Sequence, residues 1–132
     1  MKLLLDTHIW IWTVLEPGRL RKKAALALAN HDNELWLSPI SIWEVSILAQ
    51  KNRLELDQDF HGWVSTALSL TTFREAPITN EVVLEISKIQ FMHRDPADRF
   101  IAASARVFDL TLVTTDPLLL GLKSQGIAVL SG

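Results

Sequence analysis

Short apolar runs alternate with longer amphipathic stretches along the chain. The run from Lys2 to Leu5 shows no polar alternation, which is typical of a strand buried on both faces of a parallel sheet. Similar runs predict strands at 34–37, 111–114 and 127–130, with a short edge strand at 72–74. Apolar residues at helical spacing predict helices at 19–30, 40–51, 60–70, 80–90 and 97–108, with another starting at Thr7 and loops at 54–59 and 93–96.

Strands that alternate with helices at this spacing predict an α/β fold. We expect a short parallel β-sheet of four or five strands flanked by helices on both faces, formed by one domain over residues 1–132. In open sheets of this kind the ligand crevice lies outside the carboxyl ends of the strands. Acidic residues at those ends are therefore the first candidates for chemistry.

Two aspartates directly follow predicted strands. Asp6 comes after the first strand, and Asp116 comes after the strand at 111–114 and precedes Pro117. Each can equally serve as the N-cap of the next helix, because Asp accepts from the free N–H groups of a first helical turn. Taken singly, both positions leave capping and function open.

Two further acids lie within apolar faces of predicted helices. Glu44 falls in the stripe of the helix at 40–51, either as part of a capping box with Ser41 or, if Ser38 caps the helix before Pro39, as a carboxylate directed at the core. Asp98 heads a helix that is apolar nearly all round, and Asp95 is its natural N-cap. A buried charge without partners is costly, so Asp98 needs a partner or a metal.

Composition narrows the chemistry that these acids can perform. The 132 residues include no cysteine, and the four histidines lack zinc-ligand spacing, which leaves oxygen ligands and a hard cation such as Mg²⁺ or Mn²⁺. The net charge of −2 argues against nucleic-acid binding, yet setting four clustered acids aside leaves 11 acidic against 13 basic residues. The first apolar run is too short to span a membrane, so we expect a cytoplasmic protein.

Four segments resemble the VapC toxins of the PIN-domain family: LLLDTHIWIW, SPISIWEVSIL, DPADRFIAASA and LVTTDPLL, in this order and spacing. The resemblance spans nearly the whole chain. It implies a PIN-like fold and a catalytic, metal-binding quartet at Asp6, Glu44, Asp98 and Asp116. It also implies Mg²⁺- or Mn²⁺-dependent RNA cleavage, a homodimer, and inhibition by a cognate antitoxin.

Neighbouring polar residues have possible supporting roles. Thr7, Asp95 and Thr115 adjoin the acids and are candidates for orienting or capping contacts around a metal site. Arg94 and Arg99 adjoin the third acid, and each can either contact the RNA backbone or form a surface ion pair.

Two other functions compete with the nuclease. A phosphoryl-transfer domain could use the strand-end Asp6 as its nucleophile, although this leaves the buried Glu44 unexplained. A non-catalytic binding module would use the acids only as helix caps and its tryptophans for a partner. We also expect one of Trp10, Ile11 and Trp12 to face a partner, because three consecutive large apolar residues span a wide helical arc.

Overall fold

The computed structural model describes residues 1–91 and 95–132, and its centre is a five-stranded parallel sheet. Its strands lie in the order β3-β2-β1-β4-β5, and every neighbouring pair is parallel. The strands are β1 (Lys2–Leu5), β2 (Glu34–Leu37), β3 (Phe73–Glu75), β4 (Thr111–Thr114) and β5 (Val129–Ser131). The α/β fold predicted from the sequence is confirmed.

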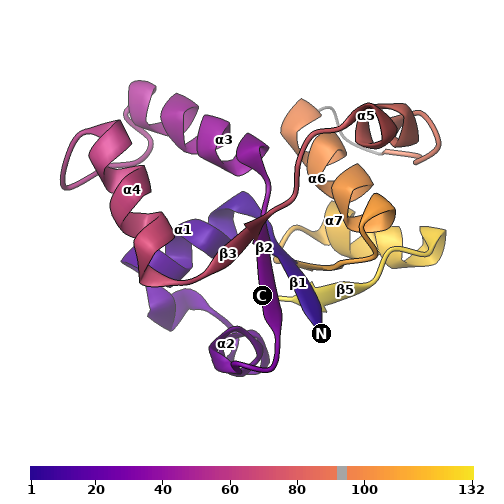
Figure 1. The fold of residues 1–132 in the computed structure, drawn as a ribbon, viewed down its shortest axis with the longest axis horizontal. Coiled ribbons are helices and arrows are strands. Elements are labelled where there is room, and N and C mark those ends of the chain that lie inside the picture. The colour runs from indigo at the N-terminus through magenta and orange to yellow at the C-terminus, as the bar shows by residue number, and fades with distance from the viewer. Residues whose placement is uncertain (92–94) are drawn as a thin grey trace.

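Helices cover both faces of this sheet, as Figure 1 shows. One layer is formed by α1 (Thr7–Leu15), α2 (Lys22–Ala29), α3 (Pro39–Gln50) and α4 (Phe60–Leu70). The other is formed by α5 (Asn80–Ile86), α6 (Pro96–Val107) and α7 (Pro117–Leu120). Two 3₁₀ turns complete the layers: η1 (Pro17–Arg19) lies between α1 and α2, and η2 (Gly121–Gln125) follows α7.

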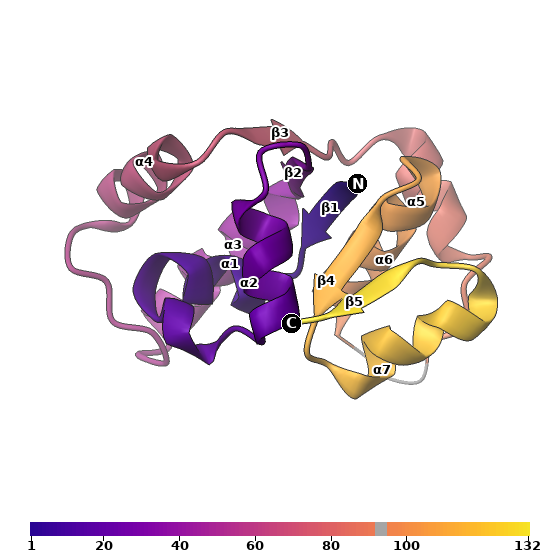
Figure 2. The same cartoon turned by 90° about the horizontal axis from the view of Figure 1, so that it is seen from below.

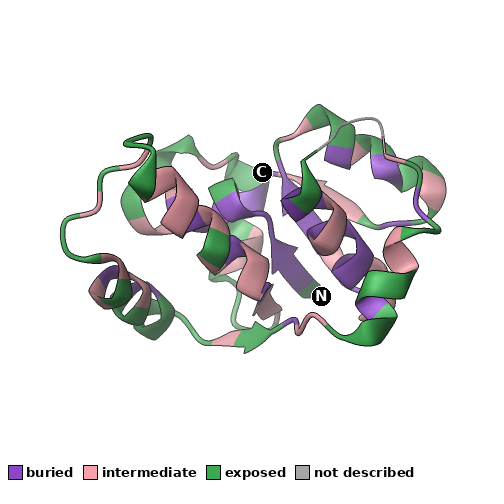
Figure 3. Cartoon of the chain, turned by 90° about the horizontal axis from the view of Figure 1, so that it is seen from above, coloured by how far each residue is buried: buried purple, intermediate pink, exposed green. Residues whose placement is uncertain are grey.

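The central strand β1 supplies side chains to both cores. Leu3 and Leu5 pack under α1 to α4, whereas Leu4 packs under α5 to α7. All three side chains are fully buried, because successive residues of a strand point to opposite faces. Figure 3 shows this buried strand between the two layers of helices.

The strand order determines where a ligand crevice can form. From β1 the chain builds outward through β2 and β3, and it then crosses to β4 on the other side of β1. The carboxyl ends of β1 and β4 therefore flank the point where the direction of winding reverses, which is where open parallel sheets bind ligands. Asp6 and Asp116 follow these two strands.

Three predicted boundaries were wrong. The helix predicted at 19–30 begins only at Lys22, because Pro17 starts a separate 3₁₀ turn and Arg21 is extended. The helix predicted at 80–90 ends at Ile86, and turns follow it. The strand predicted at 127–130 is shifted to Val129–Ser131, since the left-handed Gly126 delays the start of regular pairing.

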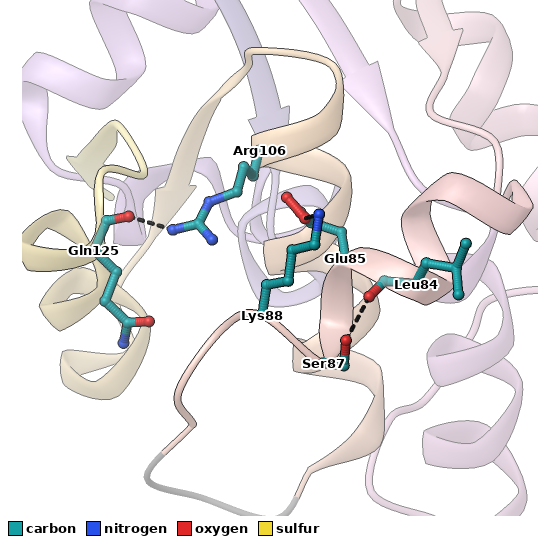
Figure 4. A network of polar contacts seen from close by, with 6 residues as sticks. All are labelled: Leu84, Glu85, Ser87, Lys88, Arg106 and Gln125. Atoms are coloured by element: carbon teal, nitrogen blue, oxygen red, sulfur yellow. Dashed lines mark hydrogen bonds and ion pairs between the residues drawn. The ribbon is translucent and has the colours of Figure 1, made fainter.

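Side-chain hydrogen bonds connect α6 to η2 and cap the end of α5. Figure 4 shows Arg106 of α6 donating to the backbone carbonyl of Gln125 at the end of η2. On α5, Ser87 Oγ donates to the Leu84 carbonyl at 2.8 Å, which helps to end that helix. The predicted loop at 93–96 lies partly outside the described residues.

No helix in the described ranges is long and apolar enough to cross a bilayer.

The aromatic residues of α1 are mostly covered within the chain. Trp10 is fully buried edge-on against Trp63, with ring centroids 5.3 Å apart, and Ile11 is 5% exposed. Trp12 is half-buried, and the guanidinium of Arg19 lies 4.4 Å from its ring centroid. Because α3, α4 and η1 all pack against α1, a wider arc of that helix is buried than a single apolar stripe would cover.

Candidate active site

Asp6 is held by backbone and side-chain contacts at the carboxyl end of β1. Its Oδ1 accepts from the N–H of Thr7 at 2.8 Å, which makes it the N-cap of α1. Its Oδ2 accepts from Thr114 Oγ1 of the adjacent strand β4 at 2.7 Å. The side chain is only 6% exposed, so Asp6 combines the capping role with a buried position at the winding reversal.

Glu44 approaches Asp6 through the hydroxyl of Thr7. Thr7 Oγ1 makes a short hydrogen bond to Glu44 Oε1 and another, of 2.9 Å, to Ser41 Oγ. Helix α3 is capped by Ser38, whose Oγ accepts from Ile40 N, so Glu44 has no capping-box role with Ser41. The sequence had left this alternative open, and the structure decides for Ser38.

Asp98 points inward from the first turn of α6. Asp95 is the N-cap of that helix, with its Oδ1 accepting from Ala97 N at 3.0 Å. Asp98 is 8% exposed, as expected for an acid that heads a buried helix. The two acids therefore have different roles: the exposed Asp95 caps the helix, and the buried Asp98 lies close enough to Asp6 and Glu44 for their charges to interact.

Asp116 follows β4 and caps α7, with its Oδ1 accepting from Leu118 N at 2.9 Å. Its own N–H donates to Thr114 Oγ1 at 3.0 Å. One buried hydroxyl therefore contacts both Asp6 and the backbone of Asp116. The neighbouring Thr115, a candidate for such a contact from the sequence, is exposed.

The four carboxylates interact electrostatically. Burial, together with the negative charges of Asp6, Asp95, Glu44 and Asp116, raises the pKa of Asp98 to about 8. Burial likewise raises the pKa of Glu44 to about 7, against the lowering effect of its hydrogen bond from Thr7. The pKa of Asp6 is raised mainly by burial. A cation among these groups would relieve the repulsion.

The donor set suits a hard divalent cation. It consists of carboxylate and hydroxyl oxygens from Asp6, Glu44, Asp98, Asp116 and Thr114, the ligand type that Mg²⁺ and Mn²⁺ prefer. Within residues 1–91 and 95–132, no three acidic or imidazole groups are already arranged to hold one ion. The capping and hydroxyl contacts hold the carboxylates in place while their charges repel one another.

Of the two arginines that are candidates for contacting RNA, only Arg99 lies among the described residues. The guanidinium of Arg99 lies 5.5 Å from the ring centroid of Phe91, and its Nε is buried without a hydrogen-bond partner in the described part of the chain. Arg94 lies outside the described residues.

Sequence reasoning missed Thr114 and considered Ser41 only as a helix cap, whereas both residues help to hold the acids in position. Both hydroxyls are fully buried. Ser41 lies one helical turn before Glu44, and Thr114 lies two residues before Asp116 in a strand that is otherwise apolar at its end. A hydroxyl residue placed two or three positions before an acid of the site is the sequence signal that could have identified both residues.

The sequence-family model described as the PIN domain matches residues 3–120, which include all four acids. The ribonuclease VapC22 of Mycobacterium tuberculosis (strain ATCC 25618 / H37Rv) is 33% identical over 114 residues, covering 86% of this chain and 85% of the relative. The chain belongs to the PIN-domain family.

Solved structures agree with the PIN fold. A VapBC2 complex of Rickettsia felis, bound to a DNA fragment from its promoter, contains a chain that matches with a TM-score of 0.74 at 16% identity, over 99% of this PIN chain and 98% of that one. A DNA-bound VapBC of Salmonella typhimurium matches with a TM-score of 0.70 at 19% identity, over 99% and 98% of the two chains.

Removing the Thr114 hydroxyl from the PIN-domain site is expected to lower both stability and activity. Thr114→Val keeps the side-chain shape but removes the donor to Asp6 and the acceptor for Asp116 N–H, at a cost of about 1–3 kcal/mol. We expect a lower melting temperature and roughly 10–100-fold less activity. Thr111→Val on the same strand is the matched control, and Thr114→Ser should restore most of both losses.

Without divalent metal, the protein is expected to be more stable at about pH 6 than at about pH 8.5. The raised pKa values of Glu44, about 7, and Asp98, about 8, mean that the folded state binds more protons than the unfolded state between their ordinary values near 4 and these raised ones. The free energy of unfolding therefore falls as the pH rises through this window. Thermal unfolding in EDTA measures this, and a melting temperature that rises with pH across the window would contradict it.

Proposed function

We propose that the chain is a divalent-metal-dependent endoribonuclease and the toxin of a type II toxin–antitoxin module, acting in the cytoplasm as one PIN domain over residues 1–132. One observation carries the proposal: Asp6, Glu44, Asp98 and Asp116 interact at the carboxyl end of the sheet, where the strand order reverses. The 33% identity to a ribonuclease, VapC22, supports RNA as the substrate.

In this proposal the carboxylates of Asp6, Asp98 and Asp116 would hold Mg²⁺ or Mn²⁺, and Glu44 would complete the acidic quartet beside the ion. When bound, the cation stabilises charge on the phosphate oxygens and activates the attacking water. Asp6 is fixed for this role by Thr7 N–H and Thr114 Oγ1, which set the direction of both its oxygens. Asp98 and Asp116 approach from the starts of α6 and α7.

Glu44 is the residue that we assign to the attacking water. Its Oε1 is occupied by the hydrogen bond from Thr7, and Oε2 takes the proton of the water. Its pKa of about 7 is near the operating pH, where a general base is most effective. Thr7 and Ser41 orient this carboxylate from α1 and α3.

A cleavage assay with purified protein tests the enzyme. Wild-type protein with Mg²⁺ or Mn²⁺ should cut RNA, EDTA should stop the cutting, and Asp6→Asn should remove it. Asp57→Asn, which changes an acid of the exposed loop after α3, is the matched control and should cut normally. Cleavage by Asp6→Asn at the wild-type rate would overturn the proposal.

The toxin role has its own test in cells. Solved complexes of toxin with antitoxin from Klebsiella pneumoniae and other bacteria share the fold, which supports a cognate antitoxin for this chain. The homodimer implied by the family resemblance is part of the same proposal. Induced expression of the wild-type chain should arrest growth, and expression of Asp6→Asn should not. Growth that is equally slow with both would contradict an RNA-cleaving toxin.

A further inference from the structure

Three consecutive cations, Arg21, Lys22 and Lys23, form an exposed group at the start of α2. Three other basic residues form ion pairs: Arg19 with Glu16, Arg74 with Glu34 and Lys88 with Glu85. In the described part of the chain the cations at 21–23 form no ion pair. Their charge is therefore available to a partner.

This position is unfavourable for the stability of the helix. The N-terminus of a helix carries partial positive charge and favours acids, and here Arg21 is the N-cap, makes no side-chain capping bond, and is followed by two lysines. The first turn contains no acidic residue. Cations placed where they cost stability indicate a function other than folding.

Hydrogen bonds connect this basic group to the candidate active site. Arg21 N donates to the carbonyl of Gly132 at 2.8 Å, and Gly132 N donates to the carbonyl of Thr114 at 2.8 Å. Thr114 in turn holds Asp6. Figure 2 shows the chain end, the start of α2 and the start of α7 close together at one end of the sheet. Because β4 lies between β5 and β1, these two strands are two strand spacings, about 10 Å, apart.

The cations also line an open hollow of roughly 570 Å³. Its other wall is the edge strand β5, through Val129, Leu130 and Ser131, and none of the lining residues is acidic. A hollow of this size, positive and without a competing carboxylate, suits a chain of phosphates better than an apolar ligand.

We propose that Arg21, Lys22 and Lys23 form a basic shelf that binds the phosphates of RNA beside the bond cleaved at the acidic site. The proposal rests on the proposed function, because it assigns the shelf to the same substrate. Phosphates on the shelf would offset the repulsion that the carboxylates exert on RNA, and they would orient the strand across the ends of β5, β4 and β1.

Binding of a fluorescent single-stranded RNA in EDTA at several salt concentrations tests the shelf without any cleavage. For Lys22→Gln/Lys23→Gln we expect roughly tenfold weaker binding at low salt. The slope of log K against log salt should fall by about 1.4, because each phosphate contact in a single strand contributes about 0.7. The melting temperature should stay equal or rise, since cations leave a helix N-terminus.

The matched control is Lys2→Gln/Lys51→Gln. It removes the same charge at the start of β1 and beyond the end of α3, far from the carboxyl ends of the strands, and should leave the salt slope unchanged. Equal weakening by both double variants would overturn the shelf and indicate a general effect of net charge. An unchanged slope in the shelf variant would also overturn it.

Cleavage separates this proposal from the proposed function. If the shelf binds RNA as described, Lys22→Gln/Lys23→Gln should raise KM for a long RNA and leave kcat nearly unchanged. If the wild-type chain cuts no RNA while the shelf variant still loses binding and salt slope, the shelf stands and the nuclease proposal falls. If the wild-type chain cuts RNA and the shelf variant shows the same KM, the shelf falls alone.

Discussion

Asp98→Asn is expected to reduce RNA cleavage by at least about 100-fold while leaving the metal-free fold as stable or more stable. The amide has nearly the same shape, but it cannot bind a divalent cation as a carboxylate does. In the metal-free protein Asp98 must either keep a buried charge near Asp6 and Glu44 or take up a proton, and the neutral amide avoids both costs. Initial cleavage rates and melting temperatures in EDTA measure the two effects.

A variant that loses activity but keeps or gains stability marks its acid as functional, whereas an acid needed for the fold would lose both. Asp98 is in the first turn of α6, where a negative charge also favours the helix by about 0.3–1 kcal/mol. If Asp98→Asn lowered the melting temperature in EDTA by several degrees, that helix role would dominate. Asp57→Asn, in the exposed loop, should change neither quantity.

Mn²⁺ is expected to stabilise the wild-type protein strongly. A ligand present at 100 times its Kd adds about 2.7 kcal/mol to the free energy of unfolding, which for a chain of this size raises the melting temperature by roughly 8–12 °C. The increase should be smaller at about pH 6, because protons on Glu44 and Asp98 then compete with the cation. Thermal unfolding with and without Mn²⁺ measures it.

The variant Asp6→Asn controls for binding elsewhere on the surface. It should lose most of the Mn²⁺ effect, and Asp57→Asn should keep all of it. An equal rise in the melting temperature of wild type and Asp6→Asn would show that the stabilising ion binds outside the four acids.

The sequence predicted the sheet well because buried parallel strands leave a simple pattern. Leu3, Leu4 and Leu5 need apolar surroundings on both faces, and only helices on both sides of a sheet provide them. Boundaries that depend on single backbone conformations were less accessible. The extended Arg21 that delays α2 and the left-handed Gly126 that delays β5 leave no periodic signal.

The acids were accessible from the sequence, but the contacts that hold them were not. Asp6 and Asp116 follow predicted strands, so their place at one end of the sheet follows from parallel pairing. Thr114 bonds Asp6 across 108 positions of sequence, and Thr7 bonds Glu44 across 37. Such pairs depend on tertiary packing, which local pattern does not encode.

The chemistry of the RNA ends tests the central claim most directly. In the proposed mechanism, water activated within the acidic quartet attacks the phosphate without using the 2′-hydroxyl. Wild-type protein with Mn²⁺ should therefore give products free of 2′,3′-cyclic phosphate, and Asp6→Asn purified in parallel should give no products. Cyclic phosphate ends, or cutting that continues in EDTA, would contradict metal-assisted hydrolysis at the acidic quartet of Asp6, Glu44, Asp98 and Asp116.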